Sequence, residues 1–521
     1  MTFKRKFVIS FFSLLIFIIL AAFLPIKKNN SAFDKIKVEG GYISGTVNST
    51  GDIHIFKGVP FAAPPVGPLR WKAPQAVVPW DGTKICDKFG PSPMQAKPVP
   101  FSMWSEEFLI PKEPISEDCL YLNVWTGAKS SKEKRAVIVW IYGGGFVSGG
   151  SAVPIYDGEA IAKKGIVFVS INYRVGLFGF FAHPDLTKES PNNASGNYGL
   201  MDQIAALKWV QKYISDFGGD PSNVTIAGQS AGSMSVNCLV ASPLAKNLFQ
   251  KAIGESGASF TNGNSTLQKA EEEGTKLMKA ANLSSLNDLR ALSAEDLMKK
   301  SGGFRGPIID GYVLPESILN IFKDGKENKV SLLTGWNQDE GLLFGPTKKA
   351  AEFQKEANDK YGSDAATFLK YYPANSDSEA AASQLNLSRD MIFAAQNYAW
   401  ANMQAAQGMK VYVYRFVRKP PATGEYIKYG AFHTGEVPYA YDNLKFVNRP
   451  WQEVDHQLAA TMSSYWANFA KTGDPNGKGL PDWPAYTVSD KKIILLNAKT
   501  EAVKLPEEAG LDFLLSKMRG R

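Results

Sequence analysis

The chain has 521 residues, 44% of them hydrophobic, which is enough to bury the core of one large domain or two. Its 58 Lys and Arg against 50 Asp and Glu give a formal net charge of +8. Five of the cations stand at positions 4–6 and 27–28, which leaves 53 basic against 50 acidic residues, or +3, elsewhere. The rest of the chain is therefore too close to neutral to have the positive charge typical of a nucleic-acid-binding protein, and no nucleic acid is expected as a partner.

The N-terminal segment indicates export. Residues 7–26 are uncharged and almost wholly apolar, with basic residues at 4–6 before them and at 27–28 after them. This pattern is typical of a secretory signal, whereas its length and the lack of a small-residue cleavage site also suit an uncleaved anchor. We therefore predict a signal peptide or N-terminal membrane anchor over 1–28, a folded domain over 29–521, and a periplasmic or secreted protein, with a membrane tether through residues 7–26 as the alternative.

The cysteines fit an oxidising compartment. Cys86 and Cys119 stand on either side of a loop rich in proline and methionine, and we expect them to form a disulfide. Closing a loop of this size is worth roughly 3 to 4 kcal/mol in the chain-entropy model. Cys238 is expected to be a small buried core residue on a helix.

Short apolar runs predict strands through the first half of the chain. Two of these runs, 136–142 and 166–172, are unbroken, as in strands covered on both faces. The strands expected in this half are 41–47, 53–61, 116–125, 136–142, 166–172 and 224–227. A proline-rich stretch over 60–79 is expected to be irregular, and 199–217 shows helical spacing of apolar residues.

The second half continues the alternation of strands and helices. Further strands are expected at 330–334 and 411–416, and the polar, Ala/Glu/Lys/Leu-rich stretches 265–300 and 347–407 are expected to be helical insertions. Strand and helix in alternation predict a mainly parallel sheet with helices on both faces. Without a Gly/Ser-rich or Pro-rich linker between these parts, one catalytic domain with insertions is the simpler interpretation.

A candidate nucleophile lies at Gly228-Gln229-Ser230-Ala231-Gly232. A buried strand precedes it and a helix follows it, which is the required context of a G-x-S-x-G nucleophile elbow. The two glycines permit a turn too tight for a Cβ and so expose the Ser230 hydroxyl.

A serine needs a base, and the base needs an acid to hold it. In α/β-hydrolases the chain order is Ser, then Asp or Glu, then His. His433, in a glycine-flanked loop after the 411–416 strand, is favoured over His456, which sits among charged residues on an expected exposed helix. The acid is Asp339 or Glu340, just after the 330–334 strand, and spacing alone does not separate these two.

A triple glycine after the 136–142 strand supplies a candidate oxyanion hole. Glycines let backbone N–H groups approach a substrate oxygen with no side chain between them. A lipase or esterase hole of this kind also uses the N–H of the residue after the nucleophile, here Ala231.

Together these motifs resemble the type-B carboxylesterase family, which includes the cholinesterases and the bacterial para-nitrobenzyl esterases. The resemblance runs from about residue 38 to residue 476. The matching stretches are 117–123 (EDCLYLN), 143–146 (GGGF), 172–174 (NYR), 228–232 (GQSAG), 339–341 (DEG), the His433 loop and 466–470 (WANFA).

The resemblance implies an α/β-hydrolase fold, with 29–521 as the carboxylesterase domain, and it assigns roles to individual residues. It implies Glu340 as the acid and a disulfide between Cys86 and Cys119, and it gives Ser256 a supporting role beside acid and base. The site so implied consists of Ser230, His433 and Glu340 as the triad and of Gly144, Gly145 and Ala231 as the oxyanion donors.

The chain departs from the cholinesterase pattern at Gln229, where many relatives carry glutamate. The change removes a negative charge beside the nucleophile and disfavours cationic choline esters. Trp104 resembles the cholinesterase cation-binding tryptophan but lies farther from Cys119 than the family spacing. We interpret the apolar residues of this loop as the mouth of a gorge. They are Met94, Phe101, Met103, Trp104 and Phe108.

We thus expect a serine carboxylic-ester hydrolase that acts on apolar small esters through an acyl-enzyme intermediate. No cofactor is expected, and no metal either, because the histidines are scattered and no C-x-x-C occurs. Two alternatives stay open. They are a lipase acting on aggregated acyl glycerols, with the apolar loop as its lid, and a non-catalytic cholinesterase-like binding protein, which the occupied triad positions disfavour.

Overall fold

The computed structural model describes residues 33–260, 265–300, 306–342 and 345–518. Its centre is an 11-stranded sheet with the order β16-β15-β14-β13-β12-β11-β9-β10-β8-β4-β3. The strands are β3 (Thr46–Val47), β4 (His54–Pro60), β8 (Tyr121–Thr126), β9 (Arg135–Ile141), β10 (Val167–Ile171), β11 (Gly219–Gln229), β12 (Lys251–Glu255), β13 (Ser331–Asn337), β14 (Val411–Phe416), β15 (Lys492–Leu496) and β16 (Glu501–Lys504). From β10 to β15 neighbouring strands are parallel, and the two edges are antiparallel.

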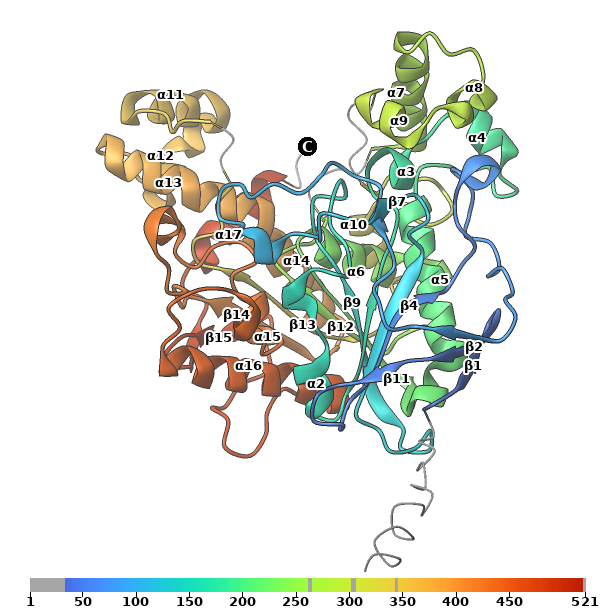
Figure 1. Cartoon of the computed structure of the whole chain (residues 1–521). Helices are drawn as coiled ribbons and strands as arrows, with labels where there is room; N and C mark the ends of the chain where they lie inside the picture. Colours follow the sequence, from blue (N-terminus) through green and yellow to red (C-terminus); the bar gives the residue numbers. More distant parts are fainter. Residues whose placement is uncertain (1–32, 261–264, 301–305, 343–344, 519–521) are drawn as a thin grey trace, which may run out of the picture.

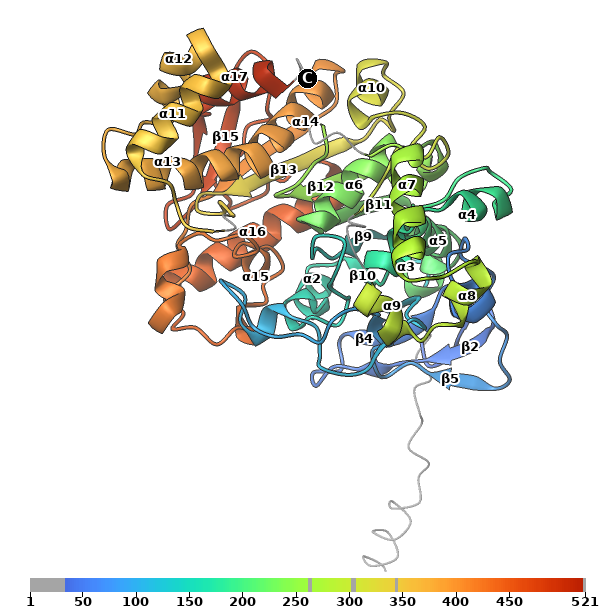
Figure 2. The same ribbon diagram turned by 90° about the horizontal axis from the view of Figure 1, so that it is seen from above.

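Helices cover both faces of this sheet, as the sequence predicts (Figure 1). Helices α5, α6 and α14 pack on one face, and α2 and α16 pack on the other (Figure 2). The helices are α2 (Glu159–Lys163), α3 (Gly176–Phe180), α4 (Pro184–Glu189), α5 (Tyr198–Tyr213), α6 (Ala231–Ala241), α7 (Leu267–Ala280), α8 (Leu286–Ala291), α9 (Ala294–Lys300), α10 (Ile318–Lys323), α11 (Ala350–Tyr361), α12 (Ala365–Tyr371), α13 (Asp377–Arg389), α14 (Ala395–Ala406), α15 (Val437–Ala440), α16 (Glu453–Thr472) and α17 (Glu508–Met518). The apolar strands β9 and β10 are accordingly buried on both faces, and β12 is buried throughout as well.

Two helical lobes rise on either side of the top of the sheet in Figure 1. Helices α7, α8 and α9 form one lobe and α11, α12 and α13 form the other. Each lobe packs in a small apolar cluster that it shares with neighbouring elements, which are α3, α4 and α5 for the first and α17 for the second. The predicted helical insertions at 265–300 and 347–407 correspond to these lobes and to α14. Two small sheets lie outside the main one, β1 (Ile36–Val38), β2 (Gly41–Ser44) and β5 (Thr83–Ile85), and β6 (Ser92–Pro93) with β7 (Ile115–Ser116).

The structure does not confirm the expected disulfide, since it shows Cys86 and Cys119 as free cysteines. The carbonyl of Cys86 accepts a hydrogen bond from the N–H of Lys57, whereas that of Leu120, next to Cys119, accepts from Phe61. These two donors lie four residues apart in the chain.

The N-terminal prediction is not addressed by the structure, because residues 1–28 lie outside the described residues. From residue 33 on, no helix of the described part combines the length and apolarity that a membrane span requires.

Candidate active site

Ser230 stands at the sharp turn between β11 and α6. Its backbone has φ 58° and ψ −124°, a conformation that costs a non-glycine residue energy and persists only where the surroundings enforce it. A Cβ on Gly228 would lie 2.5 Å from the carbonyl carbon of Gly232, and one on Gly232 would lie 2.0 Å from the oxygen of Ile141. Only glycine fits at both positions, so the G-x-S-x-G spacing is what allows the turn to form.

Neighbouring strands hold this turn in place. The N–H of Ser230 donates to the carbonyl of Glu255 at the end of β12 (2.9 Å), and the carbonyl of Ser230 accepts from Met234 in α6 (2.9 Å). A Cβ on Gly257 would lie 2.5 Å from the Ser230 oxygen, so the next loop also packs tightly against the turn. The hydroxyl is therefore carried by a rigid part of the sheet edge.

His433 and Glu340 meet at this edge. Nδ1 of His433 lies 2.8 Å from Oε2 of Glu340, and the other carboxylate oxygen of Glu340 accepts from the N–H of Asn337 (2.8 Å). Glu340 is fully buried and His433 is 3% exposed. A carboxylate in this position orients the imidazole and supports a positive charge on it.

The structure also distinguishes Asp339 from Glu340, which sequence spacing alone did not. Asp339 accepts a hydrogen bond from the N–H of Ala431 (2.8 Å) and donates its own N–H to the carbonyl of the same residue (3.0 Å). It therefore ties the His433 loop to the end of β13 without touching the ring. His456 is exposed on α16 and has no place in this cluster.

Three further side chains surround the His433 ring. Phe393 stacks on it, with centroids 4.3 Å apart and planes at 20°, and Trp104 meets it edge-on at 6.3 Å. Nε2 of Gln229 lies 3.2 Å from Nε2 of the ring. Among the described residues the ring contacts Glu340 and Gln229 at hydrogen-bond distance but not the Ser230 hydroxyl. Catalytic hydrogen bonds of free enzymes are often long and tighten with substrate.

The glycine loop lies directly beside the nucleophile. A Cβ on Gly143 would be 2.9 Å from the Cβ of Ser230. Gly144 and Gly145 have φ 124° and 62°, and within the described backbone their N–H groups donate no hydrogen bond. Ala231 is the first residue of α6, where a helix leaves its N–H groups free. These amides are available to a developing oxyanion.

Two buried glutamates beneath the triad are functional candidates that sequence reasoning missed. Oε1 of Glu255 accepts from the hydroxyl of Tyr441 (3.0 Å) and from Nε1 of Trp466 (2.9 Å), and Glu436 accepts from the side chain of Asn337. Burial raises the pKa of Glu255 to about 7, and burial together with the nearby carboxylates raises the pKa of Glu436 well above its usual range. The sequence does hold a sign of these two glutamates, because Glu255 directly precedes Ser256 and Glu436 lies three residues after His433.

Ser256 follows Glu255 at the end of β12 and has φ 53°. Its N–H donates to the carbonyl of Gly335 (2.9 Å), while its hydroxyl is buried with no hydrogen-bond partner among the described residues. The structure thus places Ser256 beside the elbow but shows no contact from its hydroxyl to acid or base.

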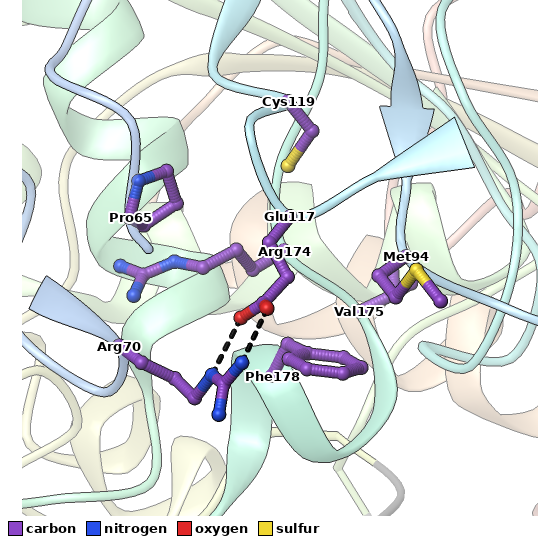
Figure 3. Close-up of a pocket in the computed structure, with 8 residues that line it drawn as sticks. All are labelled: Pro65, Arg70, Met94, Glu117, Cys119, Arg174, Val175 and Phe178. Carbon is purple, nitrogen blue, oxygen red and sulfur yellow. Dashed lines mark hydrogen bonds and ion pairs between the residues drawn. The ribbon is translucent and has the colours of Figure 1, made fainter. Parts of the chain in front are cut away.

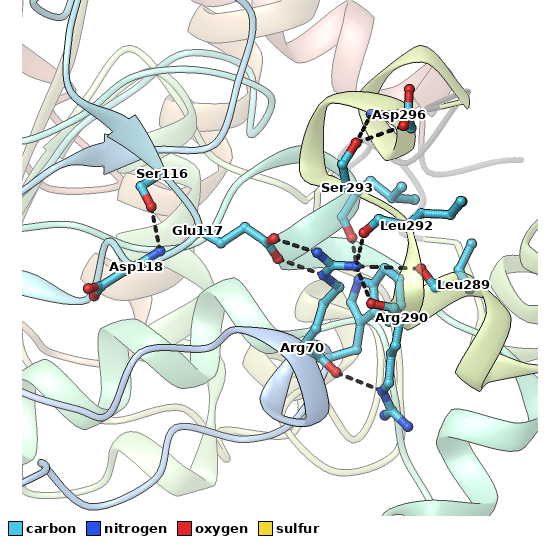
Figure 4. Close-up of polar contacts among 11 residues, drawn as sticks. Arg70, Ser116, Glu117, Asp118, Leu289, Arg290, Leu292, Ser293 and Asp296 are labelled. Carbon is cyan, nitrogen blue, oxygen red and sulfur yellow. Dashed lines mark hydrogen bonds and ion pairs between the residues drawn. The ribbon is translucent and has the colours of Figure 1, made fainter.

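A small pocket around Cys119 contains none of the triad residues (Figure 3). Arg70 and Glu117 form a bidentate ion pair there, with nitrogen to oxygen distances of 2.6 and 2.5 Å. Arg70 also donates to main-chain carbonyls at the end of α8, including those of Arg290 and Leu292 (Figure 4). Met94, one of the residues expected at the gorge mouth, lines this pocket.

Comparison with known proteins gives consistent matches over nearly the whole chain. A family model described as the carboxylesterase family matches residues 33–514. The chain is 37% identical to a fumonisin B1 esterase of Sphingopyxis macrogoltabida over 85% of this chain and 83% of that protein. It is 35% identical to a para-nitrobenzyl esterase of Bacillus subtilis (strain 168) over 91% of this chain and 96% of that protein. A solved para-nitrobenzyl esterase structure superposes with a TM-score of 0.80 at 31% identity, covering 93% of this chain and 99% of that one.

Proposed function

Because the chain belongs to the carboxylesterase family and is a carboxylic ester hydrolase of small-molecule esters, we propose that it cleaves apolar small esters through a Ser230–His433–Glu340 triad. The observation that supports this most is the convergence of three elements at one sheet edge. The strained serine lies at the end of β11, and the buried imidazole lies 2.8 Å from the buried carboxylate that follows β13.

In the first half of the reaction Ser230 attacks the ester carbonyl while Nε2 of His433 takes its proton. Glu340 keeps the proton on Nδ1 and stabilises the imidazolium. The free amides of Gly144, Gly145 and Ala231 receive the oxyanion. His433 then returns its proton to the leaving alcohol, and an acyl-enzyme remains on Ser230.

In the second half a water molecule replaces the alcohol. His433 takes a proton from this water as it attacks the acyl carbonyl, and the same amides hold the second oxyanion. When the tetrahedral intermediate collapses, His433 protonates Oγ of Ser230 and the carboxylic acid leaves.

The preference for apolar esters rests on the side chains around the base. Phe393 and Trp104 both contact the His433 ring. Phe101 packs on Trp104 at 4.8 Å and is 59% exposed, so the aromatic surface continues outward from the site. An apolar acyl or alcohol group gains free energy when it leaves water for such a surface.

Hydrolysis of para-nitrophenyl esters from acetate to long-chain acyl groups tests this proposal, with Ser230→Ala beside the wild type. We expect saturable turnover of the short esters below their solubility limit and a loss of about 10⁴-fold or more in Ser230→Ala. Activity that instead rises sharply once the substrate aggregates would favour the lipase alternative. A folded wild type that hydrolyses none of these esters would contradict the proposal.

We further propose that residues 1–28 export the chain and that the catalytic domain occupies 29–521. The support is the apolar segment 7–26 between its basic flanks. Expression of the full chain followed by N-terminal sequencing and membrane fractionation distinguishes a cleaved signal from a retained anchor. Recovery of the intact chain in the cytosol would contradict both.

A further inference from the structure

The contact between Gln229 and His433 has no role in the mechanism above. Gln229 ends β11 and is 2% exposed. Its Nε2 lies 3.2 Å from Nε2 of the ring and 3.4 Å from Nδ1. The hydrogen-bonding directions of the two ring nitrogens diverge within the ring plane. One atom close to both nitrogens therefore cannot lie along both directions. The amide therefore lies against the face of the ring, and the in-plane direction of Nε2 is left for Ser230.

Phe393 covers the other face. Its ring is nearly parallel to the imidazole at 4.3 Å, and one face of a five-membered ring is too small for both neighbours. Phe393 belongs to a π-helical turn, Asp390–Ala394, an irregularity that is frequent at functional sites. Arg389, just before this turn, donates to the carbonyl of Gln338 (3.0 Å) and so fixes the turn to the loop that carries Glu340.

The Gln229 amide is itself held in one orientation. The hydroxyl of Thr434 donates to Oε1 of Gln229 (3.5 Å) and accepts from Nε1 of Trp104 (3.1 Å). An amide whose oxygen receives this hydrogen bond presents its NH₂ group to the ring. Trp104, Thr434 and Gln229 thus form a chain of polar contacts from the apolar loop to the base.

We propose that Gln229 is a positioning residue. With Phe393 it clamps the imidazole so that Nε2 faces Ser230, and its neutral amide, unlike a carboxylate at the same place, adds no charge beside the base. The inference rests on the proposed function. The charged groups that face the ring are Glu340, in contact with Nδ1, and Glu436, which is bound to Asn337 behind it, while Asp339 binds the backbone of the same loop.

Two substitutions of Gln229 separate charge from position. In Gln229→Glu a carboxylate lies against the ring and stabilises the imidazolium, so we expect the acid limb of kcat/KM to move about one pH unit higher. Gln229→Met keeps the size but removes the amide. We expect kcat to fall about 10-fold with KM nearly unchanged, because the ring is oriented less well, and the acid limb to move much less than in Gln229→Glu.

The measurements use the full chain with para-nitrophenyl acetate between pH 5 and 9. Diethyl para-nitrophenyl phosphate, which phosphorylates Ser230 and releases one para-nitrophenol per site, counts active sites in each variant. Thr434→Val and Thr434→Ser form a second pair. The valine removes the hydroxyl that holds the amide and should lower kcat severalfold, and the serine should restore it.

The outcomes divide clearly. Gln229 variants with full active-site counts, wild-type kcat and an unmoved acid limb would overturn the proposal. A lower kcat that follows lower thermal stability, with the acid limb unmoved in Gln229→Glu, would also overturn it, since the role would then be structural. If the Gln229 variants do not fold, equal kcat values for Thr434→Val and Thr434→Ser reject it. A wild type that hydrolyses no ester is a failure of the proposed function, not of this inference.

Discussion

Asp339 and Glu340 are adjacent acids with different contacts, which makes them a matched pair. Glu340 meets Nδ1 of His433, whereas Asp339 meets only the backbone of Ala431. We expect Glu340→Gln to lower kcat by about 10⁴-fold, because the amide favours the wrong imidazole tautomer. Asp339→Asn should lower kcat far less and act mainly on thermal stability. Steady-state kinetics of both variants check this, and equal losses of kcat would contradict the assignment.

Glu255 gives the stability of the protein a pH dependence. Burial raises its pKa from 4.5 to about 7, so the folded state retains a proton that the unfolded chain releases between these values. The contribution of Glu255 to the free energy of unfolding is fully present below pH 4.5 and is lost as the pH rises through 7. The free energy of unfolding then decreases by about 3 kcal/mol. Glu436, whose pKa is also raised, adds to the same trend.

Thermal unfolding of Glu255→Gln between pH 5 and 8 tests this prediction. We expect the melting temperature of the wild type to fall more steeply with pH than that of Glu255→Gln. Glu295→Gln, at an exposed glutamate of α9, is the control and should follow the wild type. Parallel curves for the wild type and Glu255→Gln would show that Glu255 does not titrate in this window.

At the scale of elements, Arg70 links three segments that are far apart in sequence. Its guanidinium binds Glu117 and the carbonyls at the end of α8, and the side chains of the ion pair are 6% and 11% exposed (Figure 4). Removal of one partner of a buried ion pair leaves an uncompensated charge. We therefore expect Glu117→Gln to lower the free energy of unfolding by about 3 to 5 kcal/mol.

Denaturant unfolding of single and double variants measures this effect. Arg70→Met with Glu117→Leu should cost less than the two single changes together, because no charge remains buried. Asp359→Asn, which breaks the exposed pair with Lys355, is the matched control and should cost less than about 1 kcal/mol. A cost for Glu117→Gln no larger than this control would count against a structural role for the pair.

The same scale shows which elements the sequence predicts well. Unbroken apolar runs locate β9 and β10 to within one residue, because strands covered on both faces need apolar side chains throughout. The strand expected at 411–416 coincides with β14. β12 was missed, since Lys251 at its start and Glu255 at its end interrupt the apolar pattern although both are buried. The stretch predicted as a strand from residue 116 becomes part of the main sheet only at Tyr121.

At the scale of the whole molecule, the order of the candidate residues along the chain was predictable and their contacts were not. The chain order is Ser230, then Glu340, then His433, as in α/β-hydrolases, and each residue comes after a strand of the main sheet. Whether Asp339 or Glu340 meets the ring depends on the backbone after β13, and the clamp of Gln229 and Phe393 joins residues 164 positions apart. Spacing carries no information about such a contact.

The state of the cysteines decides whether a disulfide crosslink contributes to the stability of the whole molecule. Cys86, Cys119 and Cys238 are all buried, and burial raises the pKa of Cys86 and of Cys238 to about 12. Since the thiolate is the reactive form, a disulfide exchange reagent should modify none of these thiols in the native protein and three after denaturation. A reducing agent should leave the melting temperature unchanged, as no crosslink restrains the unfolded chain. Two results together would instead support a disulfide between Cys86 and Cys119. They are a single reactive thiol after denaturation without reductant, and a melting temperature that falls when a reducing agent is added. The stability of the domain would then depend on the redox state of its compartment, whereas the free thiols imply that it rests on the packing around the sheet alone.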